Sequence, residues 1–169
     1  MADRVRVGIL GAGIGAEHLA AYQRLSDRFQ VVELCDLDGA RARAVVDTAV
    51  ATDTVVGTDA EALMARGDID LVDVCLPPHL HVPMTLCALV AGKHVICEKP
   101  LATSLADVDR LEAAAATSGR TVFPVFQYRF GPETAKLRAV LAAGLAGKPL
   151  VANIETHWRR DADYYDNPW

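Results

Sequence analysis

Along the first 126 residues, apolar residues gather in short continuous runs, and between the runs they return at every third or fourth position. Continuous apolar runs are typical of strands that are buried on both faces, and the wider spacing is typical of amphipathic helices. The pattern predicts strands at residues 4–10, 29–36, 54–57, 69–76, 94–97 and 121–126. Between them it predicts helices at residues 16–25, 38–49, 59–66, 82–92 and 104–119.

Strands and helices therefore alternate, with short connections between them. This order is typical of an α/β domain with a doubly wound parallel sheet that helices cover on both faces. Residue types at the helix ends agree with the pattern. Asp38, Asp59 and Ser104 are predicted N-caps, and Gly92 and Gly119 are predicted to end the helices before them.

The last 43 residues, 127–169, have a different pattern. A helix is predicted at residues 132–144, and residues 148–160 alternate apolar and polar side chains as a half-buried antiparallel strand does. A lone strand is not stable without partners. We therefore expect one domain at residues 1–126, and at residues 127–169 a linker, a helix and the first strand of an incomplete α+β domain.

Composition narrows the class of protein. Of the 169 residues, 51% are apolar and 23% are charged, which is typical of a globular protein. The net charge of −5 argues against a nucleic-acid partner, and no apolar run approaches the roughly 20 residues of a membrane helix. The four cysteines have no metal-binding or disulfide spacing, and the N-terminus resembles no signal peptide. We expect reduced thiols, no metal site and a cytoplasmic location.

A glycine-rich stretch, GAGIGA, directly follows the first predicted strand and opens the first predicted helix. Gly11, Gly13 and Ala16 match the G-x-G-x-x-G/A motif in this context, with Ile14 and Gly15 inside the same turn. Gly11 allows the tight turn, Gly13 lets the backbone approach a pyrophosphate, and Ala16 keeps the helix close to the sheet. The helix N-terminus can bind the phosphates. The motif predicts a Rossmann-type dinucleotide site.

Asp36 ends the second predicted strand, where a carboxylate can accept hydrogen bonds from the adenosine ribose. It repels a 2′-phosphate and so favours NAD over NADP, although Arg41 and Arg43 lie within reach of such a phosphate and keep NADP open. An S-adenosylmethionine methyltransferase also uses a GxGxG turn and an acid after its second strand. That class stays open as an alternative.

Two further motifs follow strands on the same predicted edge of the sheet. The first, CLPPHLHVP, places Leu76, Pro77, His79 and His81 after the fourth strand. Either histidine is a candidate ligand contact, although a histidine near a helix start is more often structural, and two histidines without a carboxylate make a poor metal site.

The second of these motifs, Glu98-Lys99-Pro100, follows the fifth strand. A lysine ammonium there can hydrogen-bond a substrate hydroxyl and take part in proton transfer. The alternative is a surface salt bridge, which contributes little stability.

The block PPHLHVPMTLCALVAGKHVICEKPLA, together with the glycine motif, resembles the Gfo/Idh/MocA family of NAD(P)-dependent oxidoreductases, which act largely on sugars, cyclitols and related polyols. The resemblance implies that Lys99 is catalytic and lies near the nicotinamide and the substrate, that Glu98 and His81 line the cofactor pocket, and that the bond before Pro100 is cis. It extends through FQYRFGPETAKLRAVLAAGLAGKPL and HWRRDADYYDNPW. There it implies that Arg129 lies near the cofactor and that Trp158 and Arg159 lie near the substrate.

Members of that family are roughly twice as long, and the resemblance places their second proton-transfer residue, a histidine, beyond Trp169. His157 does not take its place. We therefore expect an oxidoreductase that transfers a hydride between nicotinamide and a carbinol carbon of a polyol or sugar, here as a truncated form with little activity. We also expect homo-oligomers that form through the second-domain sheet. The alternatives are a non-catalytic dinucleotide-binding or assembly module and, less favoured, the methyltransferase.

Overall fold

The computed structural model describes residues 4–166, and the chain divides into two units at Val125 and Phe126. Each unit is described by itself. None of the helices in the described part of the chain has the length and apolar character needed to cross a membrane.

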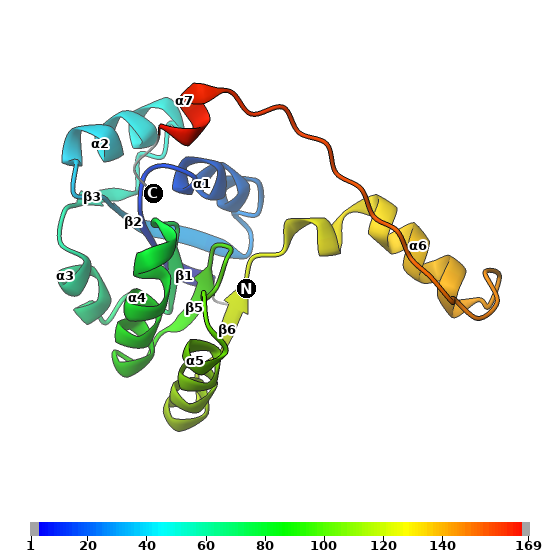
Figure 1. Ribbon diagram of the computed structural model, residues 1–169. Coiled ribbons are helices and arrows are strands. Elements are labelled where there is room, and N and C mark those ends of the chain that lie inside the picture. Colours follow the sequence, from blue (N-terminus) through cyan, green and yellow to red (C-terminus); the bar gives the residue numbers. More distant parts are fainter. Residues whose placement is uncertain (1–3, 167–169) are drawn as a thin grey trace. The chain divides into compact units, whose positions relative to one another are not determined.

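The first unit is built on a six-stranded parallel sheet (Figure 1). Its strands are β1 (Val5–Leu10), β2 (Phe29–Cys35), β3 (Val55–Gly57), β4 (Leu71–Val74), β5 (His94–Cys97) and β6 (Val122–Pro124). They lie in the order β3-β2-β1-β4-β5-β6, with every neighbouring pair parallel. The predicted doubly wound α/β fold is confirmed.

Five helices cover the two faces of this sheet: α1 (Gly15–Arg24), α2 (Gly39–Thr48), α3 (Ala60–Ala65), α4 (Pro78–Val90) and α5 (Leu105–Ser118). One core cluster joins α1 and α2 to one face through residues such as Leu19 and Val46. The other joins α3 and α4 to the opposite face through residues such as Leu63 and Leu89, with α5 packed beside it through Ala114. Strands buried on both faces explain why their sequences are apolar almost throughout.

The predicted helix caps are confirmed. The carboxylate of Asp38 accepts hydrogen bonds from the amides of Ala40 and Arg41 at the start of α2, and Asp59 does the same for α3. Ser104 accepts a hydrogen bond from the Asp107 amide at the start of α5, and Gly119 ends this helix in the left-handed conformation. Each N-cap satisfies amides that the first helical turn leaves without partners.

Helix α4 begins at Pro78, four residues before the predicted start at 82. Pro77 is extended, and Pro78 occupies the first helical position, where a fixed φ angle is suitable and no amide is needed. Pro83 lies inside the helix, where it has no amide to donate to the carbonyl of His79 one turn earlier. Pro78 therefore begins the helix, and Pro77 lies directly before it.

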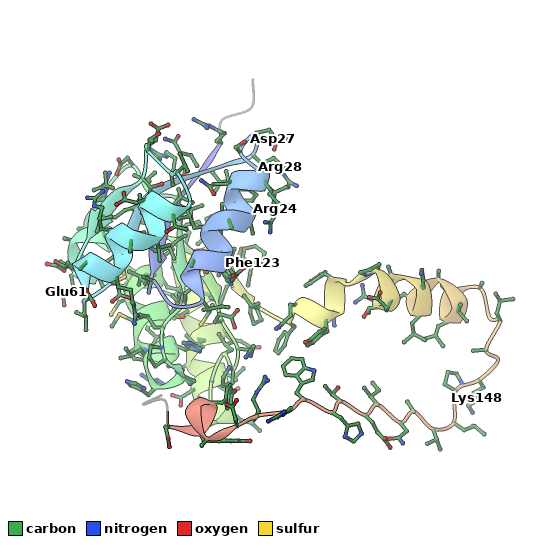
Figure 2. The ribbon with its side chains drawn as sticks, turned by 90° about the horizontal axis from the view of Figure 1, so that it is seen from above. Arg24, Asp27, Arg28, Glu61, Phe123 and Lys148 are labelled. Carbon is green, nitrogen blue, oxygen red and sulfur yellow. The ribbon has the colours of Figure 1, made fainter. Side chains whose placement is uncertain are left out.

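The second unit contains a 3-10 turn (Gln127–Phe130), helix α6 (Pro132–Ala142) and the short helix α7 (Ala162–Tyr165). The predicted strand at 148–160 is wrong for this structure: no strand is present there, and each of these residues is exposed. Figure 2 shows the chain from Lys148 onward without a strand beside it. The segment has no partner in the described part of the unit, and a single extended segment makes no ladder of hydrogen bonds.

Parallel pairing brings the carboxyl ends of all six strands to one edge of the sheet. The strand order reverses between β1 and β4, because β2 follows β1 on one side while β4 lies on the other. Ligands of doubly wound sheets bind at such a reversal, outside the carboxyl ends of the strands. The exposed group Arg24, Asp27 and Arg28 at the far end of α1 marks the opposite edge (Figure 2).

Candidate functional site

The turn after β1 lies directly against the end of β4. Gly11 has a φ of 98°, and its amide donates a 2.7 Å hydrogen bond to the carbonyl of Cys35 at the end of β2. A Cβ at this position would lie 2.5 Å from the carbonyl oxygen of Cys75. Gly11 is therefore required both by its own positive φ angle and by the close approach of the Cys75 backbone. At Gly13, by contrast, a Cβ would meet no atom within 4 Å, so this backbone is open to a ligand.

The close contact between the first helix and the sheet is made by Gly15 rather than by Ala16. A Cβ on Gly15 would lie 3.0 Å from the Cγ2 of Ile9 in β1, and Gly15 is buried. Ala16 instead lines a groove between α1 and α2. The prediction that gave Ala16 this packing role is corrected: α1 begins at Gly15, so this residue is the one that faces β1.

Asp36 lies at the end of β2 and already holds the turn together. Its carboxylate accepts hydrogen bonds from the amides of Ala12 (2.7 Å) and Asp38 (2.9 Å), and from the Arg41 guanidinium (2.8 Å). Burial alone raises the pKa of Asp36, but these three donors outweigh burial and hold the pKa below its usual value. The group therefore stays anionic, and carboxylate oxygens retain capacity for a further donor such as a ribose hydroxyl.

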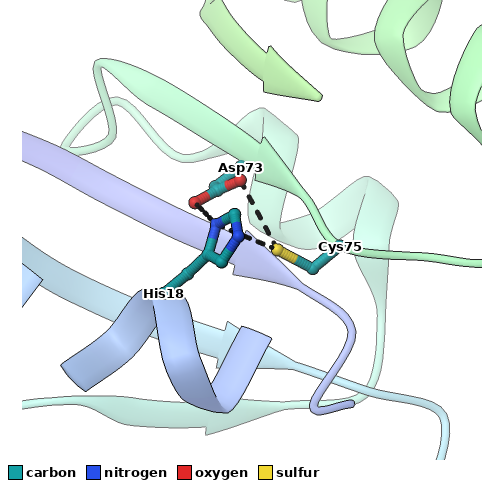
Figure 3. A group of neighbouring side chains, drawn as sticks. All are labelled: His18, Asp73 and Cys75. Carbon is teal, nitrogen blue, oxygen red and sulfur yellow. Dashed lines mark hydrogen bonds and ion pairs between the residues drawn. The ribbon is translucent and has the colours of Figure 1, made fainter. Parts of the chain in front are cut away.

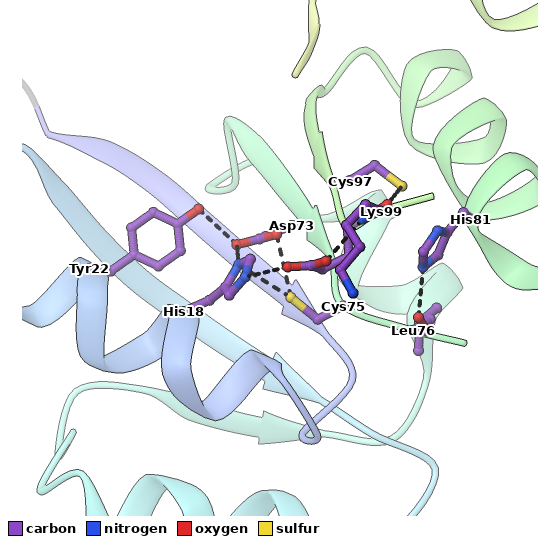
Figure 4. Close-up of polar contacts among 9 residues, drawn as sticks. His18, Tyr22, Asp73, Cys75, Leu76, His81, Cys97 and Lys99 are labelled. Atoms are coloured by element: carbon purple, nitrogen blue, oxygen red, sulfur yellow. Dashed lines mark hydrogen bonds and ion pairs between the residues drawn. The ribbon is translucent and has the colours of Figure 1, made fainter. Parts of the chain in front are cut away.

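His81 ties the loop after β5 to the turn after β4. Its Nδ1 lies 2.7 Å from the carbonyl oxygen of Pro100. Its Nε2 lies 2.7 Å from the carbonyl oxygen of Leu76 (Figure 4). Both ring nitrogens are engaged, which favours the structural role for this buried histidine. His79 is exposed in the first turn of α4 and lines a cavity of about 220 Å³ with Arg110 of α5.

Glu98 and Lys99 follow β5 at the same edge of the sheet. Glu98 is buried, and its Oε2 accepts a 2.9 Å hydrogen bond from the amide of Lys99, whose side chain is exposed. The bond between Lys99 and Pro100 is cis, as the family resemblance implies. Leu76 and Pro77 lie half-buried after β4, the neighbouring strand.

A hydrogen-bonded group that sequence reasoning missed lies beneath this edge. Asp73 in β4 is 0% exposed, and its Oδ2 accepts from the hydroxyl of Tyr22 and lies 2.8 Å from Nδ1 of His18 (Figures 3 and 4). The Nε2 of His18 lies 3.2 Å from Oε1 of Glu98, and the thiol of Cys75 donates to Oδ1 of Asp73. One signal was visible in the sequence: a carboxylate inside an apolar strand needs a buried partner.

Electrostatics favours the protonated form of His18. Burial alone lowers the pKa of this imidazole, but the hydrogen bonds and charges of Asp73, followed by those of Glu98, raise the pKa above 6.5. Burial, followed by the charge of Asp73, raises the pKa of Tyr22, which stays a phenol and donates. Because the pKa of His18 is raised on folding, its protonation stabilises the fold below about pH 6.5, and this contribution is lost as pH rises through the raised value.

His18, Asp73 and Cys75 are also the one group among the described residues whose donor atoms are close enough together for a metal ion (Figure 3). Their protonation states oppose this use. Burial raises the pKa of the Cys75 thiol well above its ordinary value, and the raised pKa of His18 favours imidazolium. Metal ligands are thiolate and neutral imidazole. We therefore interpret the group as a hydrogen-bond network.

The three remaining predicted site residues lie in the second unit, and all are exposed. Arg129 is in the 3-10 turn, and Trp158 and Arg159 are in the extended segment. The ring of Trp158 packs against Tyr128 with centroids 6.0 Å apart and lies under the guanidinium of Arg160. Their predicted contacts with cofactor and substrate stay predictions.

The residues of the first unit fit a dinucleotide. Helix α1 begins without a side-chain cap. The amides of Ala16 and Glu17 bond to the carbonyls of Gly13 and Ile14, which leaves the amides of Ile14 and Gly15 at the helix start for a phosphate. The open backbone at Gly13 lies directly before them, and anionic Asp36 lies at the end of the adjacent strand β2. Glu98 and Lys99 lie on the other side of the strand reversal, at the end of β5.

Comparison with known proteins agrees with this geometry. A model of the oxidoreductase family with an NAD-binding Rossmann fold, GFO_IDH_MocA, matches residues 5–126, and the chain belongs to this family. Inositol 2-dehydrogenase 1 of Saccharopolyspora erythraea is 34% identical over 151 residues, which are 88% of this chain and 44% of that protein. The predicted family is confirmed, which argues against a methyltransferase.

Two solved structures extend the comparison. The WlbA dehydrogenase of Bordetella pertussis, in complex with NADH and UDP-GlcNAcA, matches with a TM-score of 0.89 at 28% identity, over 98% of this chain and 47% of that one. KijD10, a 3-ketoreductase from Actinomadura kijaniata in complex with NADP and TDP-benzene, matches with a TM-score of 0.75 at 28% identity, over 85% of this chain and 43% of that one. This chain thus spans less than half the length of these proteins.

Substitution of the two motif glycines should separate folding from binding. Gly11→Ala places a Cβ against the backbone of Cys75 at a positive φ, and we expect it to lower the free energy of unfolding by at least about 2 kcal/mol. Gly13→Ala is the matched control, which we expect to keep stability within about 1 kcal/mol while weakening NAD⁺ binding at least about tenfold. Urea unfolding measures the stability of each variant, and calorimetry measures its affinity for NAD⁺. Equal stability of the two variants would contradict the packing argument.

Proposed function

We propose that this chain is the cofactor-binding part of an enzyme that moves a hydride between the nicotinamide of NAD(P) and a carbinol carbon of a sugar, cyclitol or related polyol. The observation that carries the proposal is the placement of the Gly11 turn, Asp36 and Lys99 at the carboxyl ends of β1, β2 and β5. The polyol class is supported by a relative named for inositol and by a structural neighbour solved with UDP-GlcNAcA.

In this proposal the two halves of the sheet have different roles. The turn after β1 and the start of α1 bind the pyrophosphate, and Asp36 binds the adenosine ribose. The nicotinamide then lies towards β4 and β5, where it accepts or supplies the hydride. Lys99 extends from the end of β5 as an exposed side chain. In the reduction its ammonium donates a hydrogen bond to the substrate oxygen and delivers the proton to it, and in the oxidation its neutral amine accepts the hydroxyl proton.

We expect the chain by itself to bind NAD⁺ and to be a poor catalyst. Its described second unit buries no side chain and so supplies no enclosed substrate pocket. Calorimetry should detect NAD⁺ binding, whereas NADH formation with a panel of sugars and inositols should stay at least about a hundredfold below the roughly 10 per second of a typical enzyme. Turnover near that typical value would show that the first unit and this short second unit suffice.

Cofactor preference should depend on Asp36 and Arg41. We expect NAD⁺ to bind more tightly than NADP⁺, because the anionic Asp36 repels a 2′-phosphate. Asp36→Asn should shift the preference towards NADP⁺ by about tenfold, and Arg41→Ala should lower NADP⁺ affinity, since its guanidinium lies 2.8 Å from Asp36. Asp38→Asn is the matched control and should leave the ratio unchanged. Preference for NADP⁺ in the unmodified chain would contradict this assignment.

A second candidate, a dinucleotide-binding assembly module without chemistry, is favoured by one observation. Large apolar side chains are exposed throughout the second unit, including Phe130, Leu145, Val151 and Ile154. Exposed apolar surface of this kind recruits partners. We propose that the unit mediates association into homo-oligomers, and light scattering should then show dimers or larger species at micromolar concentration. A monomer that persists at high concentration would remove this support.

A further inference from the structure

The proposed function gives no role to one group of side chains, the bridge from Asp73 through His18 to Glu98. It joins three elements that are far apart in the sequence, namely helix α1, strand β4 and the loop after β5. Asp73 is fully buried, and the side chain of His18 is only 18% exposed. The bridge is therefore part of the interior below the carboxyl edge.

The bridge requires a protonated imidazole. Nδ1 of His18 lies 2.8 Å from a carboxylate oxygen of Asp73, and Nε2 lies 3.2 Å from a carboxylate oxygen of Glu98. Both partners are acceptors, whereas a neutral imidazole has a single N–H. Only the imidazolium can donate to both carboxylates at once.

When the His18 imidazolium loses a proton, the contact that breaks is the one with Glu98. The bond to Asp73 is the shorter one, and Asp73 is more deeply buried than Glu98. The remaining proton therefore stays on Nδ1, where an unpaired carboxylate would cost most. The lone pair of Nε2 then faces Oε1 of Glu98 and repels it. The Glu98 carboxylate keeps its bond from the Lys99 amide and loses its second anchor.

Glu98 lies where an anchored carboxylate affects the cofactor. It ends β5, on the side of the strand reversal away from Asp36, and Lys99 follows it directly. When the adenosine half of the dinucleotide binds near Asp36, its nicotinamide half lies on the side of β4 and β5. If the Glu98 carboxylate is already fixed at the end of β5, it can accept a hydrogen bond from the nicotinamide half, and its side chain need not be ordered on binding.

We propose that His18 is a positioning residue of the dinucleotide site, which as an imidazolium bridge to Asp73 fixes the Glu98 carboxylate for the nicotinamide half of the cofactor. This inference rests on the proposed function. His18 itself touches no cofactor atom in it and acts through Glu98.

The surroundings of His18 set the direction of the pH effect. The groups that face it are the carboxylates of Asp73 and Glu98, the thiol of Cys75 on β4, and the Tyr22 hydroxyl that shares Oδ2 of Asp73. The two carboxylates hold the pKa of His18 above its usual value. The bridge is thus closed at pH 6 and opens as pH rises through that pKa.

The test compares NADH with ADP-ribose, which lacks the nicotinamide, in calorimetric titrations of the full chain between pH 6 and about pH 9. NADH is chosen because its ring is neutral, so a change in the charge of the bridge does not itself attract or repel it. We expect NADH affinity to fall by about three- to tenfold across this range, the effect of losing one positioned hydrogen bond, while ADP-ribose affinity stays constant.

Variants assign the pH dependence to His18. In His18→Gln the NADH profile should be flat and should equal the high-pH value of the unmodified chain. Asp73→Asn removes one carboxylate and should move the midpoint to lower pH, which a purely structural role would not do. His94→Gln is the matched control, because His94 begins β5 at the opposite edge of the sheet. Circular dichroism confirms that each variant folds.

The outcomes separate this inference from the proposed function. If neither NADH nor ADP-ribose binds at any pH, the proposed function and the role of His18 are both overturned. Binding of both ligands with parallel pH profiles overturns the role of His18 while the proposed function stands, and this comparison needs no variant. A pH-dependent NADH profile that persists unchanged in folded His18→Gln also overturns it.

Discussion

The buried carboxylate of Asp73 is the constraint on which the arrangement of the site depends. A carboxylate inside an apolar strand must be hydrogen-bonded, and two of the donors for Asp73, Tyr22 and His18, come from helix α1. These bonds fix how α1 lies against β4, and so they also fix where the N-terminus of α1 meets the end of the sheet. The same histidine then reaches Glu98 at the end of β5. One interior network therefore positions helix α1 and the segment that carries Lys99 relative to each other.

Backbone packing provides the second part of this arrangement. The amide of Gly11 bonds the carbonyl of Cys35, and the space where its side chain would lie is filled by the carbonyl of Cys75. The turn after β1 is thus held between the ends of β2 and β4. His81 adds a comparable link from α4, because its ring bridges the carbonyls of Leu76 and Pro100. These bonds hold the edge in place, and a site that is held in place lowers the entropy cost of binding.

Much of the first unit could be predicted from the sequence, because apolar periodicity and cap residues are local signals. The strand and helix order, the caps at Asp38 and Ser104, and the glycine turn follow from them. The start of α4 was missed because two prolines look like a break, although one of them begins the helix. No strand forms at 148–160, because the alternating pattern does not itself supply the partner strands that a hydrogen-bonded ladder needs. The network of His18 was missed for a related reason: its members are 55 and 80 residues apart and meet only through the fold.

Titration of His18 by nuclear magnetic resonance tests the central claim most directly, namely that an imidazolium joins the two halves of the site. The ring carbon signal of His18, assigned by its loss in His18→Gln, would be followed against pH in the free chain. The bridge predicts a pKa above the ordinary 6.5 of histidine, and a lower value in Asp73→Asn. A pKa at or below 6.5 in the unmodified chain would show that burial outweighs the two carboxylates, and it would contradict the account.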